Sequence, residues 1–385
     1  MKKIFLTGVT GLVGRAFVTA LSQDCGDDVK FVCLTRKSPV KSAYDRTKGM
    51  IKDQCDFDGI PEKFEAIMKN VEVVDGDVTS IDPEALAKDP ALEGVNVIFH
   101  CAADVNLGKD PTGKTFNINY NGTERMVKLA QLLNVKEFHY VSTAYVAGKT
   151  VGRSMEARPT CNEFNNPYEE SKCKAEGLVR DCGIPYTIYR PAIVTGRLAD
   201  GMVLKPLAFY RVLEFMAKLK SHHCAKEGIS PVEEYDLKLH FNTIASKRVY
   251  FVPIDYVQLA ITKLFQKDVC NQTYHVTGDS PVTVDMIERA ICNVLRLKHM
   301  DISKAADSNE LNKDSKMLER FIGDLFPYFS NDVIFDQTNV RKDLGDEALA
   351  WDYDVEKLEI MMRAFFIKNF KQVDWVSELL KYSER

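Results

Sequence analysis

The first half of the chain alternates short apolar runs with longer stretches of helical periodicity. Each apolar run has a core of Val, Ile, Phe or Tyr, and a continuous run of this kind is typical of a strand buried on both faces. Such strands belong to parallel sheets, whose crossover connections are right-handed and usually helical. The strands that we expect are Lys3–Leu6, Lys30–Leu34, Val71–Asp75, Val97–His100, Glu137–Ser142 and Tyr186–Arg190. The pattern predicts an α/β fold with a doubly wound, Rossmann-type parallel sheet over residues 1–196.

After residue 196 the pattern is less regular. The elements that we expect there are a helix at 206–220, strands at Val249–Val252 and Tyr274–Val276, and an amphipathic helix at 284–297. We therefore predict that residues 197–385 form a smaller, mostly helical C-terminal region that binds the substrate. Within it, residues 249–280 are expected to return to the core of the first domain.

Residues 221–248 are polar and irregular and contain His222, His223 and Cys224 side by side. These residue types bind zinc, but adjacent side chains on a helix do not face a common point, and no further ligands follow at zinc-like spacing. We expect this segment to be a solvated linker, and we predict no metal site in the chain.

The composition limits the class of protein. At 385 residues with 45% hydrophobic residues, the chain can bury a substantial core. A formal net charge of -4 lacks the basic excess of a nucleic-acid-binding protein, so nucleic acid is not an expected partner. The ten cysteines form no CxxC pair, which is typical of reduced thiols. No apolar run reaches the roughly 18 to 20 residues of a membrane span. We expect a cytoplasmic protein without a membrane span.

Residues 7–14 read TGVTGLVG and lie between the first expected strand and a helix. Glycines three residues apart permit a tight turn and let the backbone approach a diphosphate, while the helix N-terminus offers free N–H groups. This arrangement predicts a dinucleotide ligand. The cofactor contacts that we expect here are Thr7, Gly8, Thr10, Gly11, Leu12, Val13 and Gly14.

The end of the second expected strand indicates which dinucleotide is used. An enzyme that uses NAD normally places a carboxylate there for the ribose hydroxyls, whereas this chain has Arg36, and Arg46 follows. A guanidinium binds phosphate in a bidentate manner, so these residues favour the 2′-phosphate of NADPH. Asp77, followed by Val78, either accepts a hydrogen bond from the adenine amine or turns its loop.

Small and amide side chains follow the later strands. Ala102 and Ala103 come after the fourth strand, where they leave room for the cofactor backbone. His100, at the end of that strand, is expected to be a neutral structural residue. Asn119 begins a helix, and its amide either holds strand ends or takes part in a water relay.

Three residues form the candidate catalytic group: Thr143, Tyr168 and Lys172. Tyr168 and Lys172 are four residues apart, so they share one helix face. Tyrosine titrates near pH 10, and we expect Lys172, together with the cationic nicotinamide ring of the oxidised cofactor, to lower the pKa of Tyr168 so that the phenol can exchange a proton with a carbonyl oxygen. Both residues are also expected to contact the cofactor, Lys172 through the nicotinamide ribose. Thr143 can hydrogen-bond the same carbonyl oxygen, and Ser142 is the alternative for that role.

In this order the motifs resemble the extended short-chain dehydrogenase/reductases, over residues 1 to about 345. The phrases LTRKSPVKSAYDR, HCAADVNL, YVSTAYVAG, NPYEESKCKAE and YRPAIVTGR resemble more particularly the thioester reductase and fatty acyl-CoA reductase branch, the male sterility type. The resemblance implies that Thr143 polarises the carbonyl and that Arg36 and Arg46 favour NADPH. It also implies a strand beside the nicotinamide at Arg190–Pro191, and we add Pro191 and Ile193 to the expected cofactor contacts.

The resemblance implies an NADP-dependent oxidoreductase that reduces an acyl thioester of CoA or of an acyl carrier protein to an aldehyde or alcohol. Such reductases are often fused to adenylation or carrier domains, so this chain is expected to meet its carrier or substrate in trans, with an acyl carrier protein as one such partner; a homodimer is left open. The stretch FPYFSNDVIFDQTNVRKDLG also resembles extended members that act on ketones or sugars. The alternative is therefore a ketone or 3-oxoacyl reductase, a sterol-type dehydrogenase or a nucleotide-sugar epimerase. A protein that only senses NADPH is disfavoured because the tyrosine and lysine pair is complete.

Overall fold

The structure is a computed structural model that describes residues 1–303, 311–346 and 351–369. The chain divides into two compact units, each made of three segments. The first unit consists of Met1–Ala192, Tyr256–Thr277 and Val333–Ala348, and the second of Ile193–Asp255, Gly278–Asp332 and Leu349–Arg385. Residues 249–280 are thus divided between the units, with 256–277 in the first.

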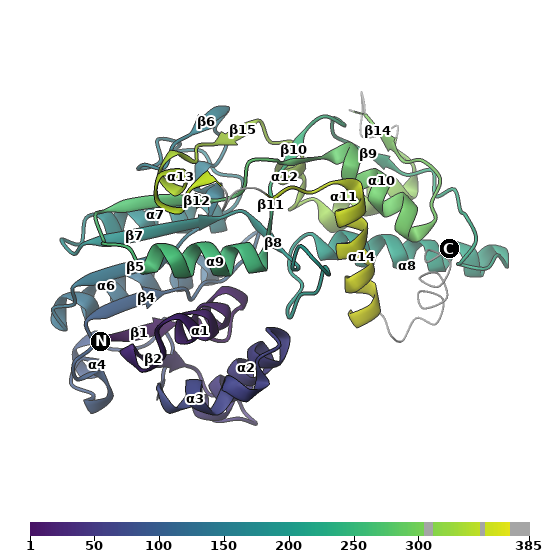
Figure 1. Cartoon of the computed structure of the whole chain (residues 1–385). Helices are drawn as coiled ribbons and strands as arrows, with labels where there is room; N and C mark the ends of the chain where they lie inside the picture. The colour runs from purple at the N-terminus through teal and green to yellow at the C-terminus, as the bar shows by residue number, and fades with distance from the viewer. Residues whose placement is uncertain (304–310, 347–350, 370–385) are drawn as a thin grey trace. The chain divides into compact units, whose positions relative to one another are not determined.

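The first unit is built on a seven-stranded parallel sheet with the order β12-β7-β5-β4-β1-β2-β3 (Figure 1). The strands are β1 (Lys2–Thr7), β2 (Val29–Thr35), β3 (Val71–Asp75), β4 (Val97–His100), β5 (Glu137–Val141), β7 (Tyr186–Pro191) and β12 (Gln272–Val276). After β3 the chain returns to the other side of β1, so the strand order reverses between β1 and β4. Ligands of such sheets bind at this reversal, beyond the carboxyl ends of the strands. The predicted Rossmann-type sheet is confirmed.

Helices cover both faces of this sheet. On one face Phe17 of α1 (Leu12–Cys25) stacks on Phe99 with ring centroids 3.9 Å apart, and Phe265 of α9 (Ile254–Phe265) packs beside them. On the other face Ile98 and its neighbours meet the helices α6 (Gly122–Leu132) and α7 (Pro167–Arg180). Successive strand residues point to opposite faces, which explains the continuous apolar runs.

Further elements complete the first unit. Helices α2 (Ala43–Phe57) and α3 (Phe64–Lys69) connect β2 to β3, and α4 (Pro83–Leu86) follows β3. Between β4 and α6 the chain forms α5 (Lys114–Phe116) and a π-helical turn (Asn117–Asn121). A separate parallel pair joins β6 (Gly152–Ser154) to β15 (Val333–Phe335), and α13 (Thr338–Leu344) follows. A late segment of the chain is thereby attached to the loop that precedes α7.

The second unit is mostly helical. Its helices are α8 (Tyr210–Glu227), α10 (Val284–Leu295), α11 (Lys313–Ile322), α12 (Phe326–Phe329) and α14 (Val355–Asn369). Its short strand pairs are β8 (Ile193–Thr195) with β11 (Phe251–Pro253), β10 (Arg248–Val249) with β13 (Val282–Thr283), and β9 (His240–Phe241) with β14 (Asp301–Ile302). No helix in the described ranges is long and apolar enough to cross a membrane.

The predicted linker around the histidine pair was wrong. Helix α8 continues to Glu227 and is capped by Gly228, whose φ of 69° is left-handed. Cys224 is buried, and His223 lies 2.9 Å from the carboxylate of Asp314 on α11. Packing of this face against α11 stabilises a polar segment whose own sequence carries little helical periodicity. Among the residues that the structure describes, no group of three or more His, Cys, Asp or Glu side chains is arranged to hold a metal ion.

Candidate active site

The glycine loop is held by backbone contacts that leave no room for side chains. Gly8 has a φ of 86°, and a Cβ there would lie 2.6 Å from the Ala102 nitrogen. A Cβ on Gly14 would lie 2.3 Å from the Gly8 carbonyl oxygen. Helix α1 begins directly after Gly11, and its first N–H groups have no partner within the helix. The loop therefore has the form that a bound diphosphate requires, with Leu12 and Val13 in the first turn.

Thr7 ties the loop to the end of β4. Its hydroxyl lies 2.6 Å from Nδ1 of His100, and it accepts hydrogen bonds from the backbone nitrogens of Cys101 and Ala102. Nε2 of His100 lies 3.0 Å from the Thr123 hydroxyl. Burial, together with the charge of Lys172, lowers the pKa of His100 to about 3, so the imidazole is neutral at pH 7. His100 has the structural role that the sequence predicted.

The predicted phosphate-binding arginines meet at the end of β2. Nη1 of Arg36 lies 3.1 Å from Asp77, and the Arg46 guanidinium donates to the carbonyl of Arg36. The Arg36 side chain is 61% exposed, so its guanidinium is accessible to a ligand. Asp77 accepts from the backbone nitrogen and hydroxyl of Thr79, both at 2.9 Å. Of its two predicted roles, the structure contains the loop turn, and the adenine contact stays a prediction.

Asn119 joins the loop after β4 to α7. It lies in the π-helical turn, where its amide oxygen accepts from Asp104 N at 2.8 Å. Its amide nitrogen donates to the Ser171 hydroxyl at 3.0 Å. Ser171 stands between the two candidate catalytic residues of α7, so this bond sets the distance from α7 to the loop that contains Ala102 and Ala103.

Helix α7 presents Tyr168 and Lys172 at the carboxyl end of β5. The helix begins at Pro167, and the Asn166 side chain caps it by accepting from Glu169 N at 3.0 Å. Lys172 is 1% exposed, donates from Nζ to the carbonyl of Val141 at 2.7 Å, and lies 4.1 Å from the centroid of the Tyr140 ring. These contacts fix the ammonium group in one place.

Burial dominates the titration of both residues. It raises the pKa of Tyr168 to about 12, and the neighbouring Thr143 hydroxyl only partly offsets this. It lowers the pKa of Lys172 to about 7, against the raising effects of Cys101 and Glu176. Desolvation of the phenolate is thus the largest effect of the protein's own groups on the pKa of Tyr168, and the lowering expected from Lys172 together with the oxidised nicotinamide stays a prediction. The phenol stays protonated at pH 7, which is the form that can donate a proton to a carbonyl.

The geometry favours Thr143 over Ser142 as the second hydrogen-bond donor. The Thr143 hydroxyl lies beside Tyr168 and donates to the Pro191 carbonyl at 3.5 Å. The Ser142 hydroxyl instead lies beside the buried carboxylate of Glu176. Pro191 ends β7 in the first unit, whereas Ile193 begins β8 in the second. The structure therefore brings together the expected residues of the first unit, and the role of Ile193 stays a prediction.

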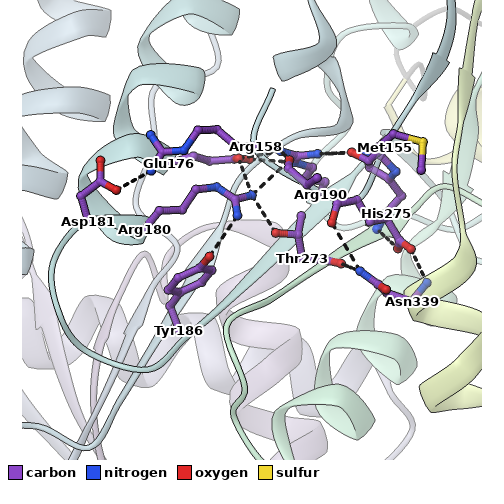
Figure 2. Close-up of polar contacts among 12 residues, drawn as sticks. Met155, Arg158, Glu176, Arg180, Asp181, Tyr186, Arg190, Thr273, His275 and Asn339 are labelled. Carbon is purple, nitrogen blue, oxygen red and sulfur yellow. Dashed lines mark hydrogen bonds and ion pairs between the residues drawn. The ribbon is translucent and has the colours of Figure 1, made fainter. Parts of the chain in front are cut away.

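Sequence reasoning missed a buried ion pair behind these residues. Figure 2 shows Arg190 between Glu176 and His275. Arg190 donates to both Glu176 carboxylate oxygens, at 2.9 and 2.7 Å, and to the carbonyls of Met155 and Ala157. Burial raises the pKa of Glu176, but the two arginines around it lower the pKa further, so the group is an anion. Its spacing of four residues beyond Lys172 was the signal that could have identified it.

A second carboxylate, Glu156, binds backbone nitrogens in the two later segments of the first unit. It accepts from the backbone nitrogen of His275 at 2.7 Å and from that of Asn339. His275 Nδ1 lies 2.7 Å from the Asp336 carbonyl, so Nδ1 donates there and Nε2 accepts from Arg190 at 3.2 Å. Burial raises the pKa of Glu156 to about 7, and the nearby charge of Asp336 adds to this.

This raised pKa predicts that the contribution of Glu156 to stability falls as pH rises from about 4.5 to 7, whereas the lowered pKa values of the buried His100 and His275 act in the opposite direction up to about pH 6.5. In the first window the unfolded chain releases the Glu156 proton while the folded chain keeps it, so this one contribution becomes less favourable by up to roughly 3 kcal/mol. Glu156→Gln imitates the protonated side chain and is expected to abolish this part of the pH dependence. Thermal unfolding midpoints at pH 5.0, 6.0 and 7.5 measure it.

The control for this prediction is Glu163→Gln, because Glu163 lies on the same stretch of chain but its side chain is 79% exposed. It is expected to leave the wild-type pH dependence in place. If Glu156→Gln and the wild type changed equally between pH 5.0 and 7.5, the carboxylate of Glu156 would not be the titrating group.

Comparison with known families gives one match over most of the chain. The family model described as "Male sterility protein" matches residues 6–261. This range contains the glycine loop, the arginines at the end of β2, and the residues Thr143, Tyr168 and Lys172.

Curated relatives carry several activities. A non-canonical nonribosomal peptide synthetase of Cladobotryum sp is 27% identical over 300 residues, which is 74% of this chain and 27% of that protein. Fatty acyl-CoA reductase 1 of Pongo abelii is 27% identical over 223 residues, 57% of this chain and 41% of that protein. A 3β-hydroxysteroid dehydrogenase/Δ5→4-isomerase of Mycobacterium tuberculosis is 30% identical over 185 residues, 46% of this chain and 42% of that protein. The chain spans only about a quarter to a third of the length of the peptide synthetases that it matches.

Solved structures share the fold. The terminal R domain of the myxalamid PKS-NRPS pathway has a TM-score of 0.73 and 22% identity, with 96% of this chain and 92% of that chain covered. UDP-glucuronic acid 4-epimerase of Bacillus cereus has a TM-score of 0.62 and 16% identity, with 94% and 98% covered. At these identities the likeness concerns the arrangement of strands and helices alone.

Proposed function

This chain belongs to the male sterility protein family, and we propose that it is an NADPH-dependent reductase that reduces the carbonyl of an acyl thioester. The observation that carries the proposal is the placement of Thr143, Tyr168 and Lys172 at the carboxyl ends of β5 and β7, beside the glycine loop of a Rossmann-type sheet. The relatives named as fatty acyl-CoA reductases support the thioester as substrate.

The chain's own residues account for the proton transfer. NADPH supplies a hydride for the acyl carbon when it is bound. The protonated phenol of Tyr168 gives its proton to the carbonyl oxygen, while the Thr143 hydroxyl donates a hydrogen bond to the same oxygen and stabilises the negative charge that develops there. The protonated form of the buried Lys172, whose pKa burial lowers to about 7, stabilises the phenolate left behind. The resulting hemithioacetal loses its thiol to give an aldehyde.

The fit of the cofactor rests on the glycine loop and on the arginines. A Cβ at Gly8 or Gly14 would strike backbone atoms, so the loop is shaped for close approach of a phosphate-bearing ligand rather than for a side chain. Arg36 and Arg46 stand at the position that would hold the 2′-phosphate of NADPH. We propose that the second unit binds the acyl group, and that the thioester is carried by CoA or by an acyl carrier protein in trans.

Arg36→Ala is expected to weaken NADPH binding by about 10- to 100-fold and NADH binding by less than threefold, because only NADPH carries the phosphate that the guanidinium pairs with. Nicotinamide fluorescence titrations of the two cofactors measure the difference. Lys37→Ala is the matched control, since Lys37 is the next cation along and pairs with Asp75. An equal loss for both cofactors would show that Arg36 does not read the phosphate.

The decisive experiment follows NADPH oxidation with acyl-CoAs, 3-oxoacyl thioesters and simple ketones, with aldehydes trapped and free thiol measured. Aldehyde and thiol produced together would support thioester reduction. The sequence similarity to a hydroxysteroid dehydrogenase keeps a ketone reductase as the second candidate. Consumption of NADPH only with ketones, with the thioester left intact, would replace the first proposal by the second.

A further inference from the structure

A buried cation directly after the glycine loop forms no ion pair with a carboxylate among the residues that the structure describes. Arg15 follows Gly14 on α1 and is only 4% exposed. Its Nε has no hydrogen-bond partner among the described residues, and Nη1 contacts only the Met50 sulfur, at 3.7 Å. A guanidinium that is buried in this way loses hydration without gaining a carboxylate, which is costly. Such a group calls for an anion that the protein itself does not supply.

The surroundings of Arg15 are already positive. Met50 lies on α2 one helical turn after Arg46, and Arg46 donates to the carbonyl of Arg36, so three arginines gather between α1, α2 and the end of β2. The first turn of α1 adds the positive end of its helix dipole. The positive charges of these arginines repel one another, and a bound anion would relieve that repulsion.

The acidic groups nearby do not remove this excess. Burial lowers the pKa of Arg15, and the field of Asp53 on α2 partly offsets the effect, but no ion pair within the described ranges joins the two side chains. Asp77 is already paired with Arg36 and bonded to Thr79. Asp45 accepts from Ser42 at the start of α2. The guanidinium of Arg15 is thus left available for a ligand.

We propose that Arg15 is a specificity-determining residue, and that the partner it lacks is the 2′-phosphate on the adenosine ribose of NADPH. The diphosphate has its own site at the first N–H groups of α1, whereas Arg15 extends sideways to α2, where Arg46 lies. A phosphate monoester carries nearly two negative charges and binds guanidinium in a bidentate manner. The inference rests on the proposed NADPH dependence and adds that Arg15 of α1 binds the 2′-phosphate.

Binding of small fragments tests this inference without any acyl substrate. Adenosine 2′,5′-bisphosphate and 5′-AMP differ only in the 2′-phosphate, and NADPH and NADH differ in the same way. Arg15→Met, which keeps much of the volume and removes the charge, is expected to weaken the bisphosphate and NADPH by about 10- to 100-fold and to change 5′-AMP and NADH by less than threefold. Isothermal titration calorimetry measures all four ligands.

Thermal stability separates ligand binding from a structural role. Because the unpaired cation is costly, Arg15→Met without ligand is expected to unfold at the same temperature as the wild type or higher. Asp53→Asn is the matched control, because it removes the negative charge that partly offsets the effect of burial on the pKa of Arg15. This variant is expected to bind NADPH as tightly as the wild type or more tightly. Equal losses for all four ligands, or a lower unfolding temperature with unchanged selectivity, would overturn the assignment of Arg15.

The failure of this inference differs from the failure of the proposed function. If wild-type protein prefers NADPH and the bisphosphate while Arg15→Met keeps that preference, the inference about Arg15 is wrong and NADPH dependence stands. If the wild type does not distinguish the members of either pair, both the NADPH assignment and the inference are overturned.

Discussion

Tyr168→Phe is expected to lower the turnover number by about 10²- to 10⁴-fold while the dissociation constant for NADPH changes by less than threefold. The substitution removes the phenol proton that we propose for the carbonyl oxygen, and it leaves the ring in place beside Thr143. Steady-state NADPH oxidation and fluorescence titration of the cofactor measure the two quantities on the same preparation.

Tyr186→Phe is the matched control for the loss of a tyrosine hydroxyl. Tyr186 begins β7, at the opposite end of the strand from Pro191, and its hydroxyl accepts from Arg180. Its turnover number is expected to stay within threefold of the wild type. A Tyr168→Phe enzyme that kept more than a tenth of its activity would show that another group supplies the proton.

Arg190→Met is expected to destabilise the protein by about 3–5 kcal/mol, because it leaves the Glu176 carboxylate buried without its bidentate partner. The contact from Arg180, at 3.4 Å, and the neighbouring Ser142 hydroxyl do not replace a bidentate pair. The Met155 carbonyl loses its Arg190 donor as well, and the Ala157 carbonyl keeps Arg180, at 3.2 Å. The midpoint of urea-induced unfolding measures the loss.

The double variant Arg190→Met with Glu176→Leu tests the cause of this loss. Replacing both members of a buried ion pair by apolar residues is often neutral, whereas removing one member leaves an uncompensated charge. The double variant is therefore expected to be more stable than Arg190→Met alone. A double variant less stable than the single one would show that the unpaired Glu176 carboxylate is not the cause of the loss.

The sequence predicted the sheet well because its signals are local. The buried strands are continuous apolar runs, and TGVTGLVG marks the turn from β1 to α1 with residues that only a tight backbone contact requires. The short pair β6 and β15 could not be predicted, since three-residue strands carry no periodicity. The last turns of α8 were missed for a related reason, because contact with α11 rather than periodicity makes that segment helical.

In the candidate site, too, local patterns could be predicted from the sequence and contacts between distant residues could not. Tyr168 and Lys172 were found from a spacing of four residues within one helix. The partners of Arg190 lie 14 and 85 residues away, and those of Glu156 lie 119 and 183 residues away. The desolvation of Tyr168 could not be predicted either, because it depends on the surrounding fold and not on its neighbour in sequence.

Because the first unit is made of three separate segments, its parts are synthesised at different times. β7 is complete at Pro191, but its neighbour β12 begins about 80 residues later, so at ordinary elongation rates the edge of β7 waits for roughly 4 to 16 seconds. Before β12 has been synthesised, Arg190 can pair with Glu176 but not with His275, and Glu156 has neither of its backbone partners. A sheet formed at that stage would have the edge of β7 open to pairing with other strands.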